Sequence, residues 1–132
     1  MSEQCRCGAP GEAIPLNLVR HHVIAAWQGQ VEGREFSFCD ALDCDVVYFT
    51  VDGDAIPTGA IRRPPAYKTG RGSDHLCFCF DVSGDDAVGD PDPSPYIRER
   101  VRRGECACDV LNPSGACCLG TIGRWMRDHR QV

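Results

Sequence analysis

No stretch of this sequence approaches the ~20 consecutive apolar residues that a membrane-spanning helix requires. The opening residues, MSEQCRCGAPGEA, also lack the basic segment followed by an apolar segment that marks an export signal. We therefore expect a cytoplasmic protein with no membrane span.

The sequence also lacks an excess of positive charge and a recognisable catalytic motif. Its net charge is −5, which argues against nucleic acid as a partner. Acidic residues gather in 81–92 and arginines in 98–103, and we expect both runs to be solvated surface. No Ser-His-Asp grouping and no glycine-rich phosphate loop is found. We expect an electron-transfer or metal-binding protein rather than an enzyme, with no catalytic residues.

Cysteine, in contrast, is abundant, with ten in 132 residues. The cysteines fall in close pairs, which are Cys5 and Cys7, Cys39 and Cys44, Cys77 and Cys79, Cys106 and Cys108, and Cys117 and Cys118. Thiolates are soft ligands that suit zinc and iron–sulfur clusters, and each such site takes about four of them. A disulfide scaffold is the alternative, but it fits a cytoplasmic protein poorly, and a C-x-C pair closes a strained ring. The pattern therefore predicts two metal sites with two cysteines left over.

Two turns in the first half of the chain each carry one of these pairs. Segments 35–38 and 46–51 are rich in aromatic and β-branched residues and are predicted to be strands, with the second cysteine pair in the turn between them. The first pair lies in a turn with glycine and proline. Four sulfurs from two turns satisfy a closed, structural zinc centre of the knuckle or treble-clef type, without His21 or His22. The predicted zinc ligands are Cys5, Cys7, Cys39 and Cys44.

The rest of the first half is predicted to hold one short helix and a linker. Asn17 is expected to cap a helix that carries Leu18, Val23, Ala26 and Trp27 on one side. The Gly-, Pro- and Arg-rich stretch 62–74 is predicted to be the linker. We expect an α+β fold in which a small, zinc-stapled, β-rich lobe over residues 1–70 precedes a helical lobe over residues 71–132.

Cysteine-bearing turns alternate with short helices in the second half. Segment 75–82 is predicted to be a strand or loop that carries ligands, and residues 83–86 have the form of a helix capping box. A helix is predicted over 95–103, with Gly104 as its stop. After a turn at 112–115, a final helix follows the last cysteine pair, and its apolar residues at helical spacing should be core. Because helix starts stabilise anions, an iron–sulfur cluster suits this half, with zinc as the alternative.

These residues resemble a known family. The segment LCFCF at 76–80 and the later segment CDVLNPSGACC at 108–118 resemble the N-terminal domain of CopZ-type copper chaperones, and CDVVYF at 44–49 resembles its zinc-binding part. The second half is similar to bacterioferritin-associated ferredoxin, a small helical fold around a [2Fe-2S] cluster. The resemblance implies one Zn²⁺ and one [2Fe-2S] cluster. The cluster ligands that it implies are Cys77, Cys79, Cys108 and Cys118, with Cys117 as the alternative to Cys118 and no assigned role for Cys106.

The resemblance also implies a function. It is that of a one-electron carrier linked to copper or other soft-metal handling, such as reduction of Cu(II) to Cu(I), whose partner is a redox protein or a copper-handling protein. That partner would be a separate heavy-metal-associated domain or a copper ATPase. The first pair is C-x-C rather than the more usual C-x2-C, a departure from the family pattern that concerns the zinc site. No M-x-C-x-x-C copper loop follows, so we do not expect copper delivery by this chain alone.

Two alternatives to electron transfer follow from the cysteine pattern. One is a metal-binding or sensing module in which Cys106 and Cys117 capture a soft ion. The other is an interaction module with two zinc sites and no redox role.

Overall fold

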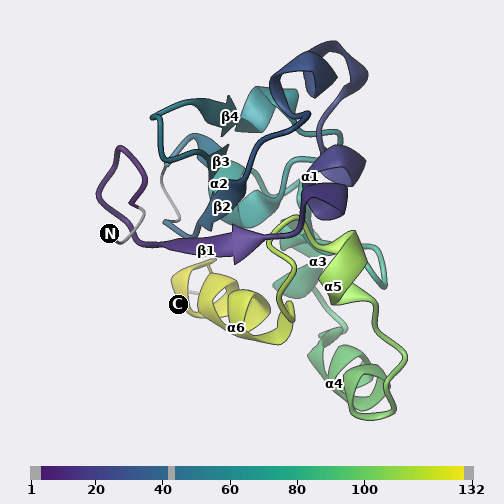
Figure 1. Ribbon diagram of the computed structural model, residues 1–132. Helices are drawn as coiled ribbons and strands as arrows, with labels where there is room; N and C mark the ends of the chain where they lie inside the picture. Colours follow the sequence, from purple (N-terminus) through teal and green to yellow (C-terminus); the bar gives the residue numbers. More distant parts are fainter. Residues whose placement is uncertain (1–3, 42–43, 130–132) are drawn as a thin grey trace.

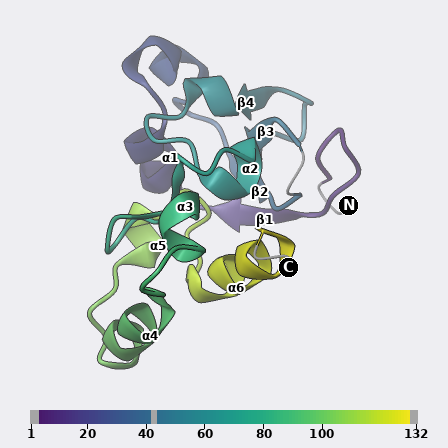
Figure 2. The same ribbon diagram turned by 180° about the vertical axis from the view of Figure 1, so that it is seen from behind.

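The computed structural model describes residues 4–41 and 44–129. A four-stranded antiparallel sheet in the order β1-β2-β3-β4 occupies the first half of the chain, and short helices follow in the second half (Figure 1). The view from behind shows α6 beside β1 and α4 at the end of the molecule away from the sheet (Figure 2).

The elements of the first half are β1 (Gly11–Ile14), α1 (Leu16–His22), the 3-10 helix η1 (Ala25–Gln30), β2 (Phe36–Cys39), β3 (Val46–Phe49), β4 (Ala55–Pro57), the 3-10 helix η2 (Thr58–Ala60) and α2 (Ala66–Thr69). Those of the second half are β5 (His75–Cys77), β6 (Val82–Ser83), α3 (Gly84–Ala87), α4 (Ser94–Arg102), α5 (Cys108–Leu111) and α6 (Leu119–His129). Within the described ranges, every helix is too short or too polar to cross a bilayer.

The two strands predicted in the first half are confirmed. They are β2 and β3, the central strands of the sheet, and every residue in both is buried. Their antiparallel register pairs Ser37 with Phe49 and Phe38 with Tyr48. Aromatic and β-branched side chains suit such a pleated, fully covered position. The turn between the two strands begins at Cys39, as the sequence predicts.

The first helix differs from its prediction. It begins one residue before Asn17, so that Asn17 lies inside the helix and is not its N-cap. It ends before Val23, whose backbone is extended and pairs with Ile61 across a β-bridge. Ala26 and Trp27 belong to the separate helix η1. The apolar spacing that suggested one helix therefore runs through two short elements.

The stretch 62–74, predicted to be a linker, contains the helix α2. Pro65 precedes this helix, and Gly70 closes it with a φ of 76°, a left-handed conformation that glycine adopts without strain. Tyr67 is 7% exposed and Lys68 only 5% exposed. The stretch therefore inserts side chains into the core rather than passing over the surface.

The helices predicted in the second half are confirmed. Ser83 caps α3 through a capping box, in which its hydroxyl accepts from the Asp86 N–H and the Asp86 carboxylate accepts from the Ser83 N–H, both at 3.1 Å. Gly104 follows α4 with a φ of 73°. α6 buries Ile122 and Trp125, as its helical spacing predicts.

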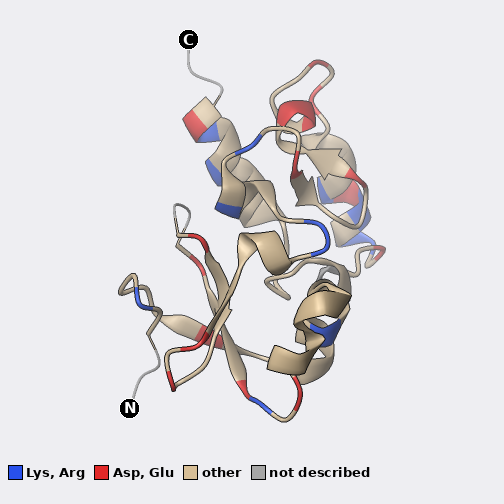
Figure 3. Cartoon of the chain, turned by 90° about the horizontal axis from the view of Figure 1, so that it is seen from above, with Lys and Arg blue, Asp and Glu red and all other residues tan. Residues whose placement is uncertain are grey.

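The arginine run lies on and just after α4, at the same end of the molecule as the acidic segment around α3 (Figure 3). Arg102 and Arg103 pair with Glu99 at 2.5 and 2.9 Å, and Arg100 pairs with Glu105 at 3.0 Å. Exposed ion pairs of this kind contribute little to stability, because water and salt screen the two charges. The charge runs therefore add little to the stability of the fold.

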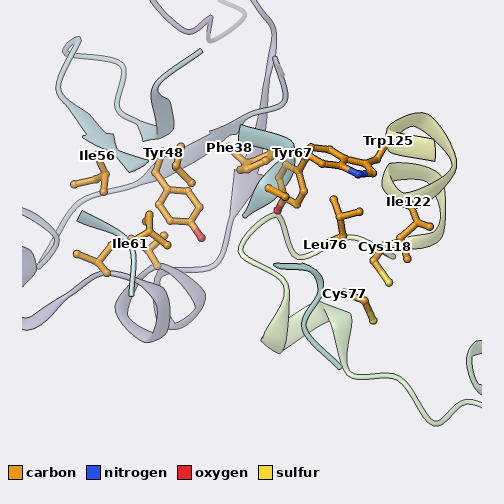
Figure 4. Packing of buried hydrophobic residues seen from close by; sticks show 14 of the residues in the cluster. Phe38, Tyr48, Ile56, Ile61, Tyr67, Leu76, Cys77, Cys118, Ile122 and Trp125 are labelled. Carbon is orange, nitrogen blue, oxygen red and sulfur yellow. The ribbon is translucent and has the colours of Figure 1, made fainter. Parts of the chain in front are cut away.

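A single cluster of buried side chains runs through both halves of the chain. In Figure 4, Tyr67 stands between the buried residues of the first half and those of the second. The labelled residues of the first half are Phe38, Tyr48, Ile56 and Ile61, and those of the second half are Leu76, Cys77, Cys118, Ile122 and Trp125.

Three side chains of the first half also hydrogen-bond one short segment of the second half, residues 110–113. The bonds run from His22 Nε2 to the Val110 carbonyl at 2.9 Å, from the Tyr48 hydroxyl to the Pro113 carbonyl at 2.5 Å, and from the Tyr67 hydroxyl to Asn112 Oδ1 at 2.6 Å. This segment comprises the end of α5 and the start of the turn before α6, so the sheet half of the molecule holds the loop that leads to Cys118.

Acid should weaken this attachment through His22. Burial lowers the pKa of His22 to about 4, whereas the same ring in the unfolded chain titrates near 6.5. The contribution of neutral His22 to the free energy of unfolding is therefore fully present above pH 6.5 and is lost as the pH drops toward 4. The loss is about 2 kcal/mol at pH 5, because only the unfolded chain takes up the proton there. Urea unfolding of the wild type and of His22→Gln at pH 7 and pH 5 measures the effect.

His22→Gln is the matched control for the wild type, because a glutamine amide can still donate to the Val110 carbonyl but cannot be protonated. We expect a smaller loss of stability between pH 7 and pH 5 in His22→Gln than in the wild type. Equal losses would show that His22 is not the group that titrates.

Candidate metal centres

Four sulfur atoms converge at one end of the sheet, those of Cys5, Cys7, Cys39 and Cys44, and all lie within 4.8 Å of one another. Cys5 Sγ is 3.7 Å from Cys44 Sγ, and Cys7 Sγ is 3.6 Å from Cys39 Sγ. A tetrahedral zinc ion with Zn–S bonds of about 2.3 Å separates its sulfurs by about 3.8 Å, whereas a disulfide requires about 2.05 Å. The spacing therefore fits four separate thiolates around one ion.

The fold brings the two cysteine-bearing turns together through the pairing of β1 with β2. The Cys5 N–H donates to the Ala9 carbonyl at 2.9 Å and the Gly8 N–H to the Cys5 carbonyl at 2.7 Å, which closes the N-terminal turn. Gly11 then pairs with Cys39 in the sheet register. The N-terminal turn therefore lies beside the turn that follows β2.

Each of the four sulfurs faces the backbone N–H of the residue two positions later. The pairs of sulfur and donor are Cys5 with Cys7, Cys7 with Ala9, Cys39 with Ala41, and Cys44 with Val46 at 3.4 Å. Hydrogen bonds of this kind favour the thiolate over the thiol. The same local geometry thus prepares each sulfur to bind a cation.

Burial acts in the opposite direction and makes the four thiols unequal. It raises the pKa of Cys5 to about 12 and also raises that of Cys39, although the Lys68 ammonium opposes the second effect. The pKa of the exposed Cys7 is lowered to about 7, chiefly by the Ala9 N–H. A metal ion entering this site has to displace protons from the buried thiols, so its affinity falls as the pH falls.

Lys68 is a residue of this centre that the sequence analysis missed. Its ammonium donates to the carbonyls of Cys39 at 2.9 Å and Ala41 at 2.7 Å, and it lies 5.8 Å from the centre of the Phe38 ring. One signal was available, because Lys68 is the only lysine in a chain with 14 basic residues. A unique lysine between two predicted lobes is a candidate for a particular buried contact.

The second predicted set of ligands lies in the helical half. Cys77 ends β5 and Cys118 directly precedes α6; both are 0% exposed. Figure 4 shows their sulfur atoms on the same side of the core, below Leu76. Cys79 follows in the β5–β6 turn, and Cys108 begins α5, but the Cys108 side chain is outside the described part of the structure.

The segment before α5 lies against the β5–β6 turn, because the Ala107 N–H donates to Cys79 Sγ at 3.1 Å. Cys106, the residue before Ala107, is half-buried and packs against the core. Cys117 is exposed, whereas its neighbour Cys118 is buried. None of the nine cysteines whose side chains are described forms a disulfide, so no disulfide scaffold is present among them.

Comparison with known proteins finds a match for the part of the chain that holds the first centre. Residues 2–62 match the model of the CopZ-type zinc binding domain. This part of the chain is similar to a zinc binding domain. All four converging cysteines lie within its limits, and their tetrahedral spacing fits the zinc that the domain is described as binding.

The zinc binding domain belongs to a larger fold that is also known. The X-ray structure of the Archaeoglobus fulgidus CopZ N-terminal domain matches this chain with a TM-score of 0.76 and 24% sequence identity, over 92% of this chain and 96% of the other. No curated protein matches. The predicted α+β fold, in which a β-rich zinc lobe precedes a helical lobe, is confirmed, as is the resemblance to the CopZ N-terminal domain.

Proposed function

We propose that this protein is a one-electron carrier that contains zinc and a [2Fe-2S] cluster and serves copper or other soft-metal handling. The zinc ligands would be Cys5, Cys7, Cys39 and Cys44, in a lobe over residues 1–70. The cluster ligands would be Cys77, Cys79, Cys108 and Cys118, in a lobe over residues 71–132. The observation that carries this proposal lies in the second predicted set of thiols, of which Cys77 and Cys118 are fully buried in one core cluster.

The zinc centre has a structural role in this proposal. Four thiolates complete a tetrahedral shell, so no coordination position is left open for a substrate or a water molecule. The ion would fasten the N-terminal turn to the turn between β2 and β3, at the end of a sheet of only four strands.

The residues around the second group of thiols suit an iron–sulfur cluster. A bound [2Fe-2S] cluster supplies a one-electron redox couple. Leu76 and Ile122, 0% and 2% exposed, exclude water from the side of Cys77 and Cys118. The Ala107 N–H donates to Cys79 Sγ, and such bonds raise a cluster's reduction potential by stabilising its more negative state.

Burial supports Cys118 over Cys117 as the fourth cluster ligand. Cys118 lies in the same buried cluster of side chains as Cys77, whereas Cys117 is exposed to solvent. Among the ligands whose side chains are described, Cys79 is only half-buried. Electron exchange with a partner would therefore take place on the Cys79 side.

The CopZ name of both matches supports a link to copper. The partner would be a redox protein or a copper-handling protein, such as a separate heavy-metal-associated domain or a copper ATPase. Reduction of Cu(II) to Cu(I) consumes one electron per ion, which is what a single [2Fe-2S] cluster delivers in one cycle.

Elemental analysis of anaerobically purified protein for iron, zinc and acid-labile sulfide tests the proposal, together with visible absorption before and after dithionite. We expect two iron atoms, two sulfides and one zinc per chain, with absorption that bleaches on reduction. Two zinc ions and no iron, after attempted reconstitution with iron and sulfide, would rule out electron transfer.

The second candidate function is a soft-metal-binding module with no redox role. The exposed Cys117 favours it, because this thiol lines a cavity of about 320 Å³ together with Asp40 and Arg124. In that case the protein would bind Cu(I) in competition with a chromogenic chelator while containing zinc alone. Cu(I) binding by protein that also holds a reducible cluster would leave the first candidate standing.

A further inference from the structure

The short helix α2 carries two buried polar side chains that reach in different directions. Lys68 reaches toward the turn after β2, and its neighbour Tyr67 reaches toward the loop before α6. Adjacent residues of a helix point about 100° apart, so a single turn of helix can contact two separate parts of the molecule. These two parts are the turn with Cys39 and the loop that leads to Cys118.

Lys68 contacts the backbone of the turn that carries Cys39, one of the predicted zinc ligands. Its ammonium donates to the carbonyls of Cys39 and Ala41, and it is only 5% exposed. Lysine is almost never buried to this extent without a partner for its charge. Among residues 4–41 and 44–129, no carboxylate forms an ion pair with it. Zinc with four thiolates has a net charge of −2, so the site itself is the anion that suits this cation.

Tyr67 binds the other loop through Asn112. The Tyr67 hydroxyl donates to Asn112 Oδ1 at 2.6 Å. Asn112 is 0% exposed, and its own Nδ2 donates to the Ala116 carbonyl at 2.9 Å. Its Oδ1 also accepts from the Ser114 N–H at 3.3 Å.

Asn112 therefore shapes the turn that leads to Cys118. The Gly115 N–H donates to the Asn112 carbonyl at 2.8 Å, and Gly115 has a φ of 73°. Ile122 in turn donates its N–H to the Cys118 carbonyl at 2.8 Å, which joins the end of the turn to the first turn of α6. A shift of Asn112 would be transmitted to the backbone that carries Cys118.

We propose that α2 couples the two cysteine centres: Lys68 senses the charge and geometry of the zinc centre, and Tyr67 transmits its position through Asn112 to the turn before Cys118. Both are positioning residues. The role of Lys68 at the zinc centre rests on the match to a zinc binding domain, and the effect on the cluster rests on the function proposed above. Occupancy of the zinc centre thus sets the surroundings of a ligand to the redox cluster.

The test uses the full chain with three single substitutions and the double variant that combines Lys68→Met with Tyr67→Phe. Lys68→Met removes the charge and keeps the length, Lys68→Arg restores a charged donor, and Tyr67→Phe removes only the hydroxyl. Zinc affinity is measured by competition with a chelator, and the 112–116 turn is followed by the backbone N–H and Asn112 side-chain NH₂ resonances of the zinc-loaded, iron-free protein. The midpoint potential of the cluster is measured in the fully loaded protein.

We expect Lys68→Met to lower zinc affinity by about tenfold or more, the range typical of groups that support metal ligands, and to shift the resonances of the turn and the midpoint potential. Lys68→Arg should restore all three. Tyr67→Phe should leave zinc affinity unchanged but shift the turn and the potential. In the Tyr67→Phe background, Lys68→Met should no longer move the turn, because the connection is already cut.

Two results would overturn the coupling. One is a turn that does not respond to Lys68→Met, and the other is a response of equal size with and without the Tyr67 hydroxyl. If Lys68→Met does not fold, Lys68→Gln, which keeps an N–H donor without the charge, makes the same comparison with and without the Tyr67 hydroxyl, since only the turn with the hydroxyl should respond. A wild type that binds no iron would overturn the electron-carrier function alone, and the resonances of the turn would still decide the coupling.

Discussion

Cys39→Ser should abolish zinc binding and unfold the four-stranded sheet. Cys39 is 0% exposed at the end of a central strand, and its sulfur faces that of Cys7 across the site. Structural zinc contributes on the order of 10 kcal/mol to small metal-dependent units, which exceeds the stability that a sheet of four short strands has without it. We expect less than one zinc per chain by elemental analysis and loss of the dispersed N–H resonances of β2 and β3.

Cys117→Ser is the matched control, because it removes an exposed thiol that is not among the predicted zinc ligands. Its zinc content and spectrum should match those of the wild type. A Cys39→Ser protein that keeps its dispersed resonances without zinc would show that the sheet is stable by itself and that the ion has another purpose.

Cys118→Ser should remove the visible absorption of the protein, and Cys117→Ser should retain it. The two residues are adjacent in sequence, but Cys118 is 0% exposed in the core beside Cys77, whereas Cys117 is exposed. A serine hydroxyl is a far weaker ligand to iron than a thiolate, so loss of one ligand should release or degrade the cluster. Iron content and absorption after anaerobic purification measure the effect.

This pair of variants also distinguishes two ways in which the predicted fourth cluster ligand could be wrong. Bleaching by Cys117→Ser with retention in Cys118→Ser would mean that the turn before α6 rearranges when the cluster binds. Retention in both would mean that the fourth ligand lies elsewhere, and the half-buried Cys106 would be the next residue to replace.

The sequence predicts the elements on which the two cysteine groups lie because local signals decide them. Aromatic and β-branched residues favour β2 and β3, and the box formed by Ser83 and Asp86 specifies the start of α3. In each case the residues that define the element lie within a few positions of one another.

The features that the sequence does not predict depend on distant partners. A helix of four residues has no apolar period that a pattern could reveal, and Tyr67 and Lys68 are buried only because Asn112 and the carbonyls of the 39–41 turn meet them. Asn17 likewise has the side chain of a cap, but the helix begins one residue earlier, directly after Pro15. Pro65 and Gly70 around α2 are the local marks that were present in the predicted linker.

The burial of Lys68 has a practical consequence for chemical labelling. Every other basic side chain in the sequence, apart from four histidines, is an arginine, so Lys68 supplies the only primary amine of any side chain. Because the amine is enclosed by the 39–41 turn, an acylating reagent reaches it only when α2 lifts away. The rate of acylation at this single position therefore records how often the region around the zinc centre opens, without any probe having to be introduced.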